Sequence, residues 1–205
     1  KRIMISLEAL KQHFHKALEF YPSTERQVFF QMLCEAYLQL QPHQLVLNAK
    51  NQISEEKFKH FEMALIRLKN HEPIQYILER SHFFGLEFLV TPAVLIPRPE
   101  TEELVAWILE HFKTTDAPTI LDLGTGSGCI SIALAKNLPN AKVFALDVSA
   151  DALEIARFNA KKNNVEIHFI ESNMLEWKST QHFDIIVSNP PYVLETEQKQ
   201  MKDNV

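Results

Sequence analysis

The sequence has few cysteines, no long apolar segment and no excess of basic residues. Its two cysteines, Cys34 and Cys129, lie far apart and lack the spacing of metal ligands, so we expect reduced thiols. The nine histidines show no ligand spacing either, and no metal site is expected. No apolar run approaches the roughly 18–20 residues that cross a bilayer, and the first residues lack the features of a signal peptide. A formal net charge of −5 argues against a broadly basic nucleic-acid-binding face, so we expect a cytoplasmic protein without a direct membrane or nucleic-acid partner.

The length and the apolar periodicity predict two domains of different kinds. A chain of 205 residues that is 46% hydrophobic can form two small cores. Apolar residues recur at steps of three and four positions over residues 5–20, 23–40 and 54–68, and this spacing predicts helices. A further short helix is expected at residues 45–47. Residues 1–75 are therefore predicted to form a small helical domain.

The region from 76 to 98 has a different character and is predicted to link the two domains. Residues 82–90 form two short apolar runs on either side of Gly85, a pattern typical of a β-hairpin. The segment LIPRPETE (residues 95–102) follows, in which two prolines flank Arg98. Proline followed by acidic residues is a signal for the start of a helix, which we expect to continue to Phe112.

Residues 99–205 are predicted to form an α/β domain. Short apolar runs at 119–123, 141–146, 165–170 and 183–188 alternate with helical patterns at 130–138 and 149–163. Buried strands separated by helices favour a parallel sheet with helices on both faces and right-handed crossovers. This is the pattern of a Rossmann-like sheet.

Two features of this domain indicate a bound cofactor. The loop DLGTGSG (residues 122–128) lies between a strand and a helix, where glycine permits tight turns and close backbone approach. Its G-x-G-x-G spacing is neither that of a dinucleotide site nor that of a P-loop, and Asp122 could meet an ammonium group, so a cofactor with an amino-acid tail fits best. Asp147 ends the next strand, where a carboxylate can bind ribose hydroxyls; capping the following helix is the alternative.

The tetrad NPPY (residues 189–192) is the strongest chemical signal. It follows the strand at 183–188, at the edge of the sheet where ligands bind in open parallel sheets. Two consecutive prolines make the loop rigid and leave its carbonyls without partners in the sheet. The Asn189 amide and a free carbonyl can together accept both protons of an NH₂ group, and Tyr192 offers a flat face for stacking. An ordinary turn at the end of a strand is the alternative interpretation.

Residues 122–128, Asp147 and the tetrad together resemble class I S-adenosylmethionine-dependent methyltransferases that modify amino groups. With the LIPRPETE segment and the helical N-terminal region, the chain resembles the HemK/PrmC family over essentially its whole length. This family methylates the glutamine of the Gly-Gly-Gln motif in peptide-chain release factors. The resemblance therefore implies a release factor as partner, a monomeric enzyme, S-adenosyl-L-methionine as cofactor and S-adenosyl-L-homocysteine as product.

The resemblance also assigns residues to the site. The cofactor contacts would be Asp122, Gly124, Thr125, Gly126, Ser127, Gly128, Asp147, Asn173, Met174 and Asn189. The catalytic residues would be Asn189, Pro190 and Tyr192, and the substrate would also contact Pro191, Arg98 and Glu100. Asn173 and Met174 stand where the family often has an acidic residue followed by an aromatic one, so adenine would be held without charge assistance or stacking.

Two alternatives remain at this stage. The tetrad alone also occurs in methyltransferases that act on the amino groups of adenine or guanine in nucleic acids. A non-catalytic module that kept an S-adenosylmethionine pocket is the other alternative. The sequence continues for 13 residues after Tyr192, whereas the resemblance implies a fifth strand and a closing hairpin, so we expect a C-terminally truncated domain whose last strand has an unpaired edge.

Overall fold

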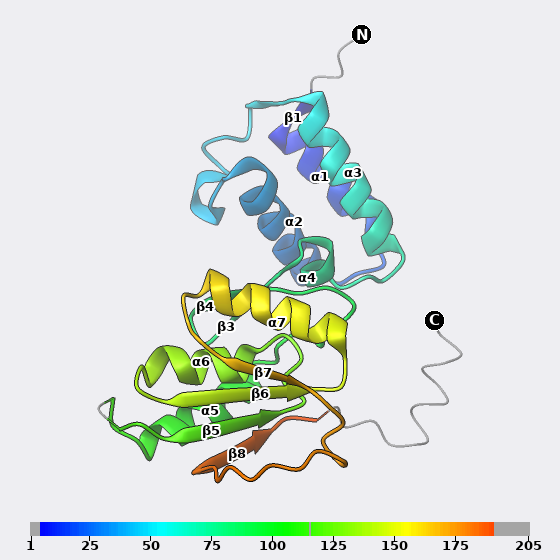
Figure 1. Cartoon of the computed structure of the whole chain (residues 1–205). Coiled ribbons are helices and arrows are strands. Elements are labelled where there is room, and N and C mark those ends of the chain that lie inside the picture. The colour runs from blue at the N-terminus through cyan, green and yellow to red at the C-terminus, as the bar shows by residue number, and fades with distance from the viewer. Residues whose placement is uncertain (1–4, 115, 191–205) are drawn as a thin grey trace. The chain divides into compact units, whose positions relative to one another are not determined.

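The computed structural model describes residues 5–114 and 116–190 of the chain. The chain divides into two compact units between Glu79 and Arg80 (Figure 1). The first unit is mostly helical and the second contains the parallel sheet.

The first unit is a small helical domain around an aromatic core. Its helices are α1 (Leu7–Ala17), α2 (Ser23–Leu38), η1 (Pro42–Gln44), α3 (Glu55–Lys69) and α4 (Ile74–Ile77). Side-chain caps fix the first residues of two of them, because Ser6 Oγ accepts from Ala9 N and Ser54 Oγ accepts from Lys57 N. The largest buried side chains from α1, α2 and α3 form the centre of the unit: Leu10, Phe14, Phe30, Leu33, Phe61 and Leu68.

Three local features of this unit differ from the sequence-based expectations. The helix expected at residues 45–47 is wrong, because Pro42 starts a 3₁₀ turn a few residues earlier and Gln44 Oε1 accepts from Gln41 N at 2.8 Å. Helix α4 follows Pro73 and was not predicted. A two-residue antiparallel pair, β1 (Ile5–Ser6) and β2 (Gln52–Ile53), was not predicted either; it is too short for a hydrophobic period to appear in the sequence.

The second unit begins with the expected hairpin. Strands β3 (Arg80–Phe83) and β4 (Leu86–Leu89) pair antiparallel, joined by Phe84 and Gly85, whose φ angles are +49° and +73°. Positive φ at both positions is the geometry of the tight turn that matches strand twist, and it is uncommon for phenylalanine. The Phe84 amide donates to Glu102 Oε1 at 2.7 Å, so a side chain of α5 (Glu100–Glu110) holds this turn in place.

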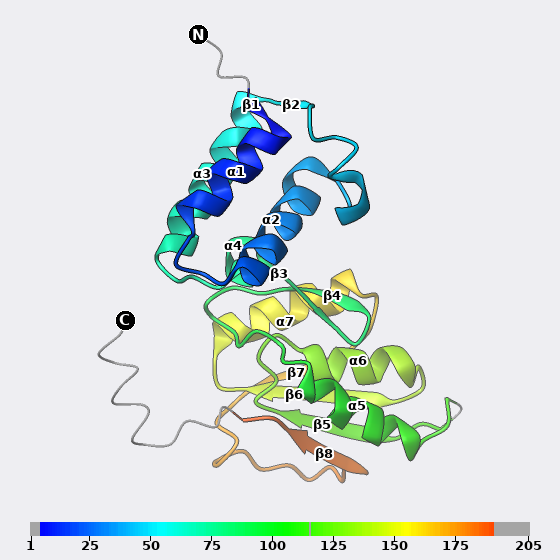
Figure 2. The ribbon, with the colours of Figure 1, turned by 180° about the vertical axis from the view of Figure 1, so that it is seen from behind.

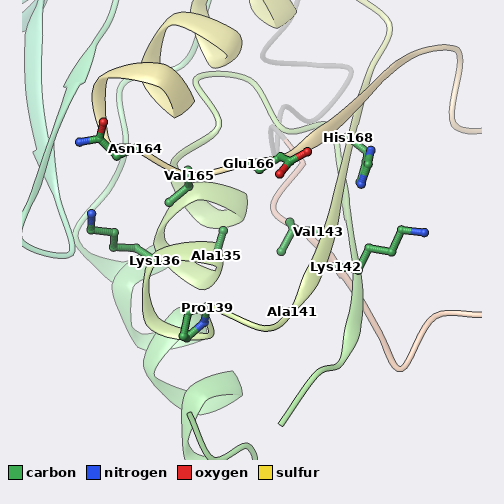
Figure 3. A pocket seen from close by; sticks show the side chains of 10 residues that line it. All are labelled: Ala135, Lys136, Pro139, Ala141, Lys142, Val143, Asn164, Val165, Glu166 and His168. Atoms are coloured by element: carbon green, nitrogen blue, oxygen red, sulfur yellow. The ribbon is translucent and has the colours of Figure 1, made fainter. Parts of the chain in front are cut away.

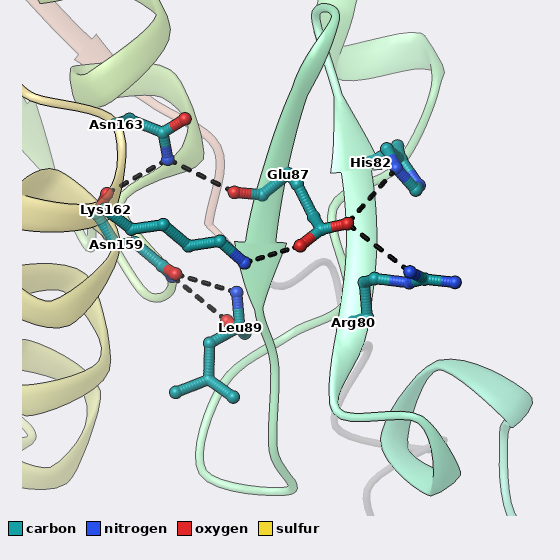
Figure 4. A network of polar contacts seen from close by, with 7 residues as sticks. All are labelled: Arg80, His82, Glu87, Leu89, Asn159, Lys162 and Asn163. Atoms are coloured by element: carbon teal, nitrogen blue, oxygen red, sulfur yellow. Dashed lines mark hydrogen bonds and ion pairs between the residues drawn. The ribbon is translucent and has the colours of Figure 1, made fainter. Parts of the chain in front are cut away.

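Polar contacts tie the hairpin to helix α7 (Ala150–Lys162), as Figure 4 shows. Glu87 Oε1 accepts from Lys162 Nζ at 2.6 Å, and Glu87 Oε2 lies 3.5 Å from Arg80 Nη1. The hydrogen bond from Lys162 is the main cause that lowers the pKa of Glu87. These charges are partly exposed, so each pair contributes little to stability on its own.

Among the residues that join the hairpin to α7, Asn159 on α7 is the buried one. Its Oδ1 accepts from Leu89 N at 2.7 Å, and its Nδ2 donates to Leu89 O at 3.0 Å (Figure 4). The same Nδ2 also donates to Ser127 O at 2.9 Å. The side chain has no exposed surface, and its one amide satisfies three backbone groups from two distant segments. Asn159 therefore joins the hairpin, α7 and the loop that follows β5 (Thr119–Leu123).

The sheet itself has four parallel strands in the order β7-β6-β5-β8. Besides β5 they are β6 (Lys142–Asp147), β7 (His168–Glu171) and β8 (Ile185–Ser188), with α6 (Cys129–Asn137) and α7 as crossovers. The chain moves outward from β5 to β7 and then returns to the other side of β5, so the strand order reverses between β5 and β8. The predicted α/β sheet is confirmed, and β8 pairs with β5 alone among the described strands.

The two faces of the sheet are covered differently. Helices α6 and α7 lie on one side (Figures 1 and 2), and Ile120, Val143 and Val187 are buried. The ring of Phe144, which alternates with Val143 on β6, packs against the rings of Phe183 and His168, with centroids 5.5 and 4.8 Å away. The prediction of helices on both faces is wrong for the described residues. Both right-handed crossovers step in the same direction, α5 packs against α6, and the connection from β7 to β8 contains no helix.

Replacing Asn159 by alanine should destabilise the second unit. The Asn159→Ala change leaves the Leu89 N–H, the Leu89 carbonyl and the Ser127 carbonyl without this partner, which should lower the free energy of unfolding by on the order of 3 kcal/mol. Chemical denaturation measures the change. The matched control is Asn163→Ala, which removes half-buried bonds to Glu87 O and Asn159 O and should cost roughly 1 kcal/mol. Equal losses in the two variants would contradict the role given to Asn159.

Candidate active site

Two of the predicted site segments lie side by side where the strand order reverses. Gly124 directly follows β5 and Asn189 directly follows β8, and the last residues of these strands, Leu123 and Ser188, are register partners. Ser188 Oγ also donates to Leu123 O at 2.8 Å, which fixes the two strand ends side by side. Carboxyl ends of parallel strands at a reversal of strand order form the ligand-binding edge of this class of sheet.

The glycine loop, residues 124–128, is held by backbone bonds to the next strand. The amides of Gly124 and Thr125 both donate to Leu146 O, at 2.8 and 3.0 Å. The Gly126 amide donates to Asp147 Oδ2 at 2.9 Å. The loop therefore turns tightly over the end of β6, and its shape is set before any ligand binds.

Two glycines of the loop, Gly126 and Gly128, have different surroundings. A Cβ on Gly128 would lie 2.9 Å from Ile132 Cδ1 and 3.2 Å from Ala156 Cβ, so this glycine allows α6 and α7 to pack closely. A Cβ on Gly126 would meet nothing within 4 Å, and Gly126 lines a pocket. Bare backbone at Gly126 is thus available to a ligand, whereas Gly128 is used for packing.

Asp122 lies beneath the loop rather than on the pocket wall. Thr125 Oγ1 donates to Asp122 Oδ2 at 2.7 Å and lies 3.0 Å from Ser131 Oγ, which donates to Gly128 O. Only 1% of Asp122 is exposed, and this burial raises its pKa to about 6 against the opposing effect of the Thr125 hydrogen bond. The carboxyl group supports the loop from below, and its predicted contact with the cofactor stays a prediction.

Asp147 links the loop to the start of α7. In addition to the Gly126 bond, Asp147 Oδ1 accepts from Ser149 N at 3.0 Å. The cap of α7 is Ser149, whose Oγ accepts from Ala152 N. Asp147 is half-buried, and each of its oxygens keeps a second lone pair that could accept from a ribose hydroxyl.

A pocket connects the loop, Asn189 and the proline segment. Six predicted site residues line it: Arg98, Gly124, Thr125, Gly126, Ser127 and Asn189. Six others line it without having been predicted: Leu95, Ile96, Pro97, Thr101, Cys129 and Ile130. Some residues predicted for the cofactor and some predicted for the substrate therefore line the same pocket.

The remaining predicted residues lie elsewhere. Glu100 and Pro190 are exposed and outside the pocket lining, and Pro191 and Tyr192 lie outside the described residues. Asn173 is exposed, and its Oδ1 accepts from Leu175 N at 3.0 Å. Met174 extends toward the loop, since its Cε would lie 3.6 Å from a Cβ on Gly124. The roles predicted for these residues stay predictions.

Cys129 is a wall residue that the sequence did not single out for this site. It begins α6 and is half-buried. Burial raises the pKa of its thiol to about 12, so the sulfur stays protonated at neutral pH. Cys34 is fully buried in the first unit, with a pKa likewise raised to about 12 by burial.

A larger pocket, of about 470 Å³, lies at the opposite edge of the sheet. It is formed around the amino ends of β6 and β7 and is lined by Lys136, Lys142, Glu166 and His168 among others (Figure 3). Lys136 Nζ donates to Asn163 O, and Lys142 Nζ lies over the Phe144 ring. None of the predicted site residues lines it, so the site is assigned to the smaller pocket at the carboxyl edge.

Comparison with known proteins decides the family. Residues 9–78 match the PrmC N-terminal domain and residues 102–204 match the Methyltransferase small domain. A release factor glutamine methyltransferase of Flavobacterium psychrophilum is 49% identical over 200 residues, covering 95% of this chain and 70% of the relative. This chain belongs to the family of release factor glutamine methyltransferases. The resemblance noted in the sequence is thereby confirmed, and the chain is a methyltransferase.

A second relative agrees with this assignment. The release factor glutamine methyltransferase of Bacteroides thetaiotaomicron is 42% identical over 189 residues, covering 91% of this chain and 67% of the relative.

Within residues 5–114 and 116–190, none of the helices has both the length and the apolar character that a membrane span requires. The same described residues contain no group of three His, Cys, Asp or Glu side chains that could hold a metal ion.

The two glycines should separate folding from ligand binding. Gly128→Ala adds a clashing Cβ at a φ of +81° and should lower the free energy of unfolding by roughly 2–3 kcal/mol. Gly126→Ala, at a φ of +54° in open space, should cost roughly 1 kcal/mol and weaken binding of S-adenosylhomocysteine. Thermal or chemical unfolding and calorimetric titration measure the two effects. A Gly126→Ala variant that is the less stable of the two would contradict this division.

Asp122 should make stability depend on pH. Its pKa is raised from 3.8 to about 6 in the folded protein, so the folded state holds more protons than the unfolded state between these values. Stability contributed by this group therefore falls as pH rises from 4 to 6, by on the order of 2–3 kcal/mol. The difference in unfolding free energy between wild type and Asp122→Asn, measured at each pH from 4 to 7, should change by this amount. A constant difference would show that Asp122 does not titrate as described.

Proposed function

We propose that this chain transfers a methyl group from S-adenosyl-L-methionine to the side-chain amide nitrogen of the glutamine in the Gly-Gly-Gln motif of a peptide-chain release factor. One observation carries the proposal: Asn189, the first residue of the tetrad, lines the same pocket as the glycine loop. A group that can accept from an amide N–H and a loop that can receive a cofactor thus lie on one wall.

The residues of this edge fit the proposed cofactor. The bare backbone at Gly126, the Ser127 wall and the free lone pairs of Asp147 offer hydrogen-bonding groups for its amino-acid tail and its ribose. Met174 would cover the adenine ring by dispersion, and Asn173 Oδ1 would use its second lone pair for the adenine amino group. When bound, the cofactor supplies an electrophilic methyl group on a sulfonium sulfur.

The protein's contribution is to orient a weak nucleophile. A glutamine amide nitrogen is a poor nucleophile because its lone pair is delocalised into the carbonyl. Asn189 Oδ1 and the Pro190 carbonyl would accept its two N–H bonds, which turns the nitrogen lone pair toward the methyl group and favours the positive charge that develops. Methyl transfer would form a nitrogen–carbon bond as the sulfur–carbon bond breaks, and the amide proton would leave late to solvent. Such catalysis is mainly positioning and fixed dipoles.

Other regions would bind the rest of the substrate. We assign the helical domain at residues 1–75 to recognition of the release factor, the hairpin region at 76–98 to a linker, and residues 99–205 to methyl transfer. Arg98, exposed at the pocket, and Glu100 would contact the factor, and Pro191 and Tyr192 would complete the site around the amide. The proposal includes a cytoplasmic monomer without direct nucleic-acid contact. The net charge of −5 supports only the last of these three parts.

The deciding experiment measures methyl transfer from labelled S-adenosylmethionine. Purified release factor should be labelled, whereas a factor with alanine in place of the Gly-Gly-Gln glutamine should not, and RNA and DNA should remain unlabelled. Asn189→Ala should reduce kcat roughly 100-fold, as loss of a fixed polar contact to the reacting group does in other enzymes. Its affinity for S-adenosylhomocysteine should stay within a few-fold of wild type.

The matched control is Asn137→Ala. Asn137 is exposed at the end of α6 and donates to Ala133 O, far in sequence from the tetrad. This variant should retain wild-type turnover. Near-normal turnover of Asn189→Ala, or labelling of nucleic acid in preference to the release factor, would overturn the proposed function.

A further inference from the structure

We propose that Thr101 is a positioning residue: its hydroxyl oxygen holds the Asn189 amide so that Oδ1 faces the substrate. The inference rests on the proposed function and extends it to a residue outside the tetrad. It starts from one contact, in which Asn189 Nδ2 donates to Thr101 Oγ1 at 2.9 Å. Both residues line the pocket, although they lie 88 positions apart in the sequence.

Thr101 is itself held firmly. It lies in the first turn of α5, only 7% exposed, and its amide donates to Arg98 O at 3.0 Å. The next residue, Glu102, accepts from the hairpin turn at Phe84 N, and α5 packs against α6. The backbone that carries the Thr101 hydroxyl is therefore held by helix α5 and by the contacts of α5 with two other elements.

The direction of the Asn189 amide decides what the pocket offers. A carboxamide has a donor end and an acceptor end of nearly the same shape. With Nδ2 on Thr101, the acceptor Oδ1 is the end left for a substrate N–H. The opposite orientation would present Nδ2 to the pocket, and a donor cannot accept from the glutamine amide.

Asn189 is half-buried and directly follows β8. Rotation of its side-chain amide by 180° exchanges the positions of Oδ1 and Nδ2. Without the Thr101 hydroxyl, the observed orientation loses the partner of its Nδ2, and the side chain can turn away from the one orientation in which Oδ1 orients the attacking nitrogen. The loss should therefore appear in the chemical step, while cofactor binding at the glycine loop is preserved. This gives the LIPRPETE segment a second task besides contact with the release factor.

The test compares Thr101→Val, which has nearly the same shape but no hydroxyl, with Thr101→Ser, which keeps the hydroxyl. Release factor methylation by Thr101→Val should show a kcat lowered roughly 10-fold, with KM and S-adenosylhomocysteine affinity within about 3-fold of wild type. Thr101→Ser should restore most of kcat. The matched control is Thr91→Val, since the Thr91 hydroxyl accepts from Ala93 N and lies outside the pocket lining; it should behave as wild type.

A double-mutant cycle separates positioning from a general structural effect. If Thr101 acts through Asn189, Thr101→Val should cause no further loss of single-turnover rate in the Asn189→Ala background. Thr101→Ala is measured in parallel, in case valine disturbs the packing of α5. A Thr101→Val enzyme with wild-type kcat, a serine variant without recovery, or a further loss in the Asn189→Ala background would overturn the inference. An inactive wild type on release factor would instead overturn the proposed function.

Discussion

The three hydrogen bonds of the Asn159 amide are the contact on which the second unit depends most directly. They join the Leu89 backbone, the Ser127 carbonyl and helix α7, segments that are far apart in the sequence. The loop that forms the pocket is thereby fixed from behind, while Asp147 and Leu146 fix it from the side of β6. A buried amide with all these partners rigidifies a site because each bond would be costly to break without water.

The order of the strands explains why the site has two halves. The glycine loop follows β5 and the tetrad follows β8, and these strands are neighbours in the sheet, with Leu123 and Ser188 as register partners. A third contribution comes from α5, which precedes the sheet in the chain and brings Thr101 to Asn189. The groups that we propose for the cofactor and for the methyl acceptor thus reach one pocket from three segments.

Much of this arrangement could be predicted from the sequence, because it depends on local patterns. The glycine loop and Asn189 each follow an apolar strand, and parallel strands end at a common edge. Contacts between distant segments could not be predicted: the packing of Gly128 against Ala156 and the bond from Asn189 to Thr101 have no sequence period. The helices expected on both faces failed for a related reason, since strand and helix patterns do not state which face a crossover covers.

The protonated thiol of Cys129 has a consequence for the fate of the methyl group. Cys129 lies on the wall of the pocket, where a thiolate would be a far better acceptor for a sulfonium methyl than a carboxamide nitrogen. Because burial raises the pKa of this thiol to about 12, the sulfur carries its proton under physiological conditions. At the proposed site, the pocket wall therefore presents a neutral thiol at this position, and no thiolate that would accept the methyl group in place of the substrate amide.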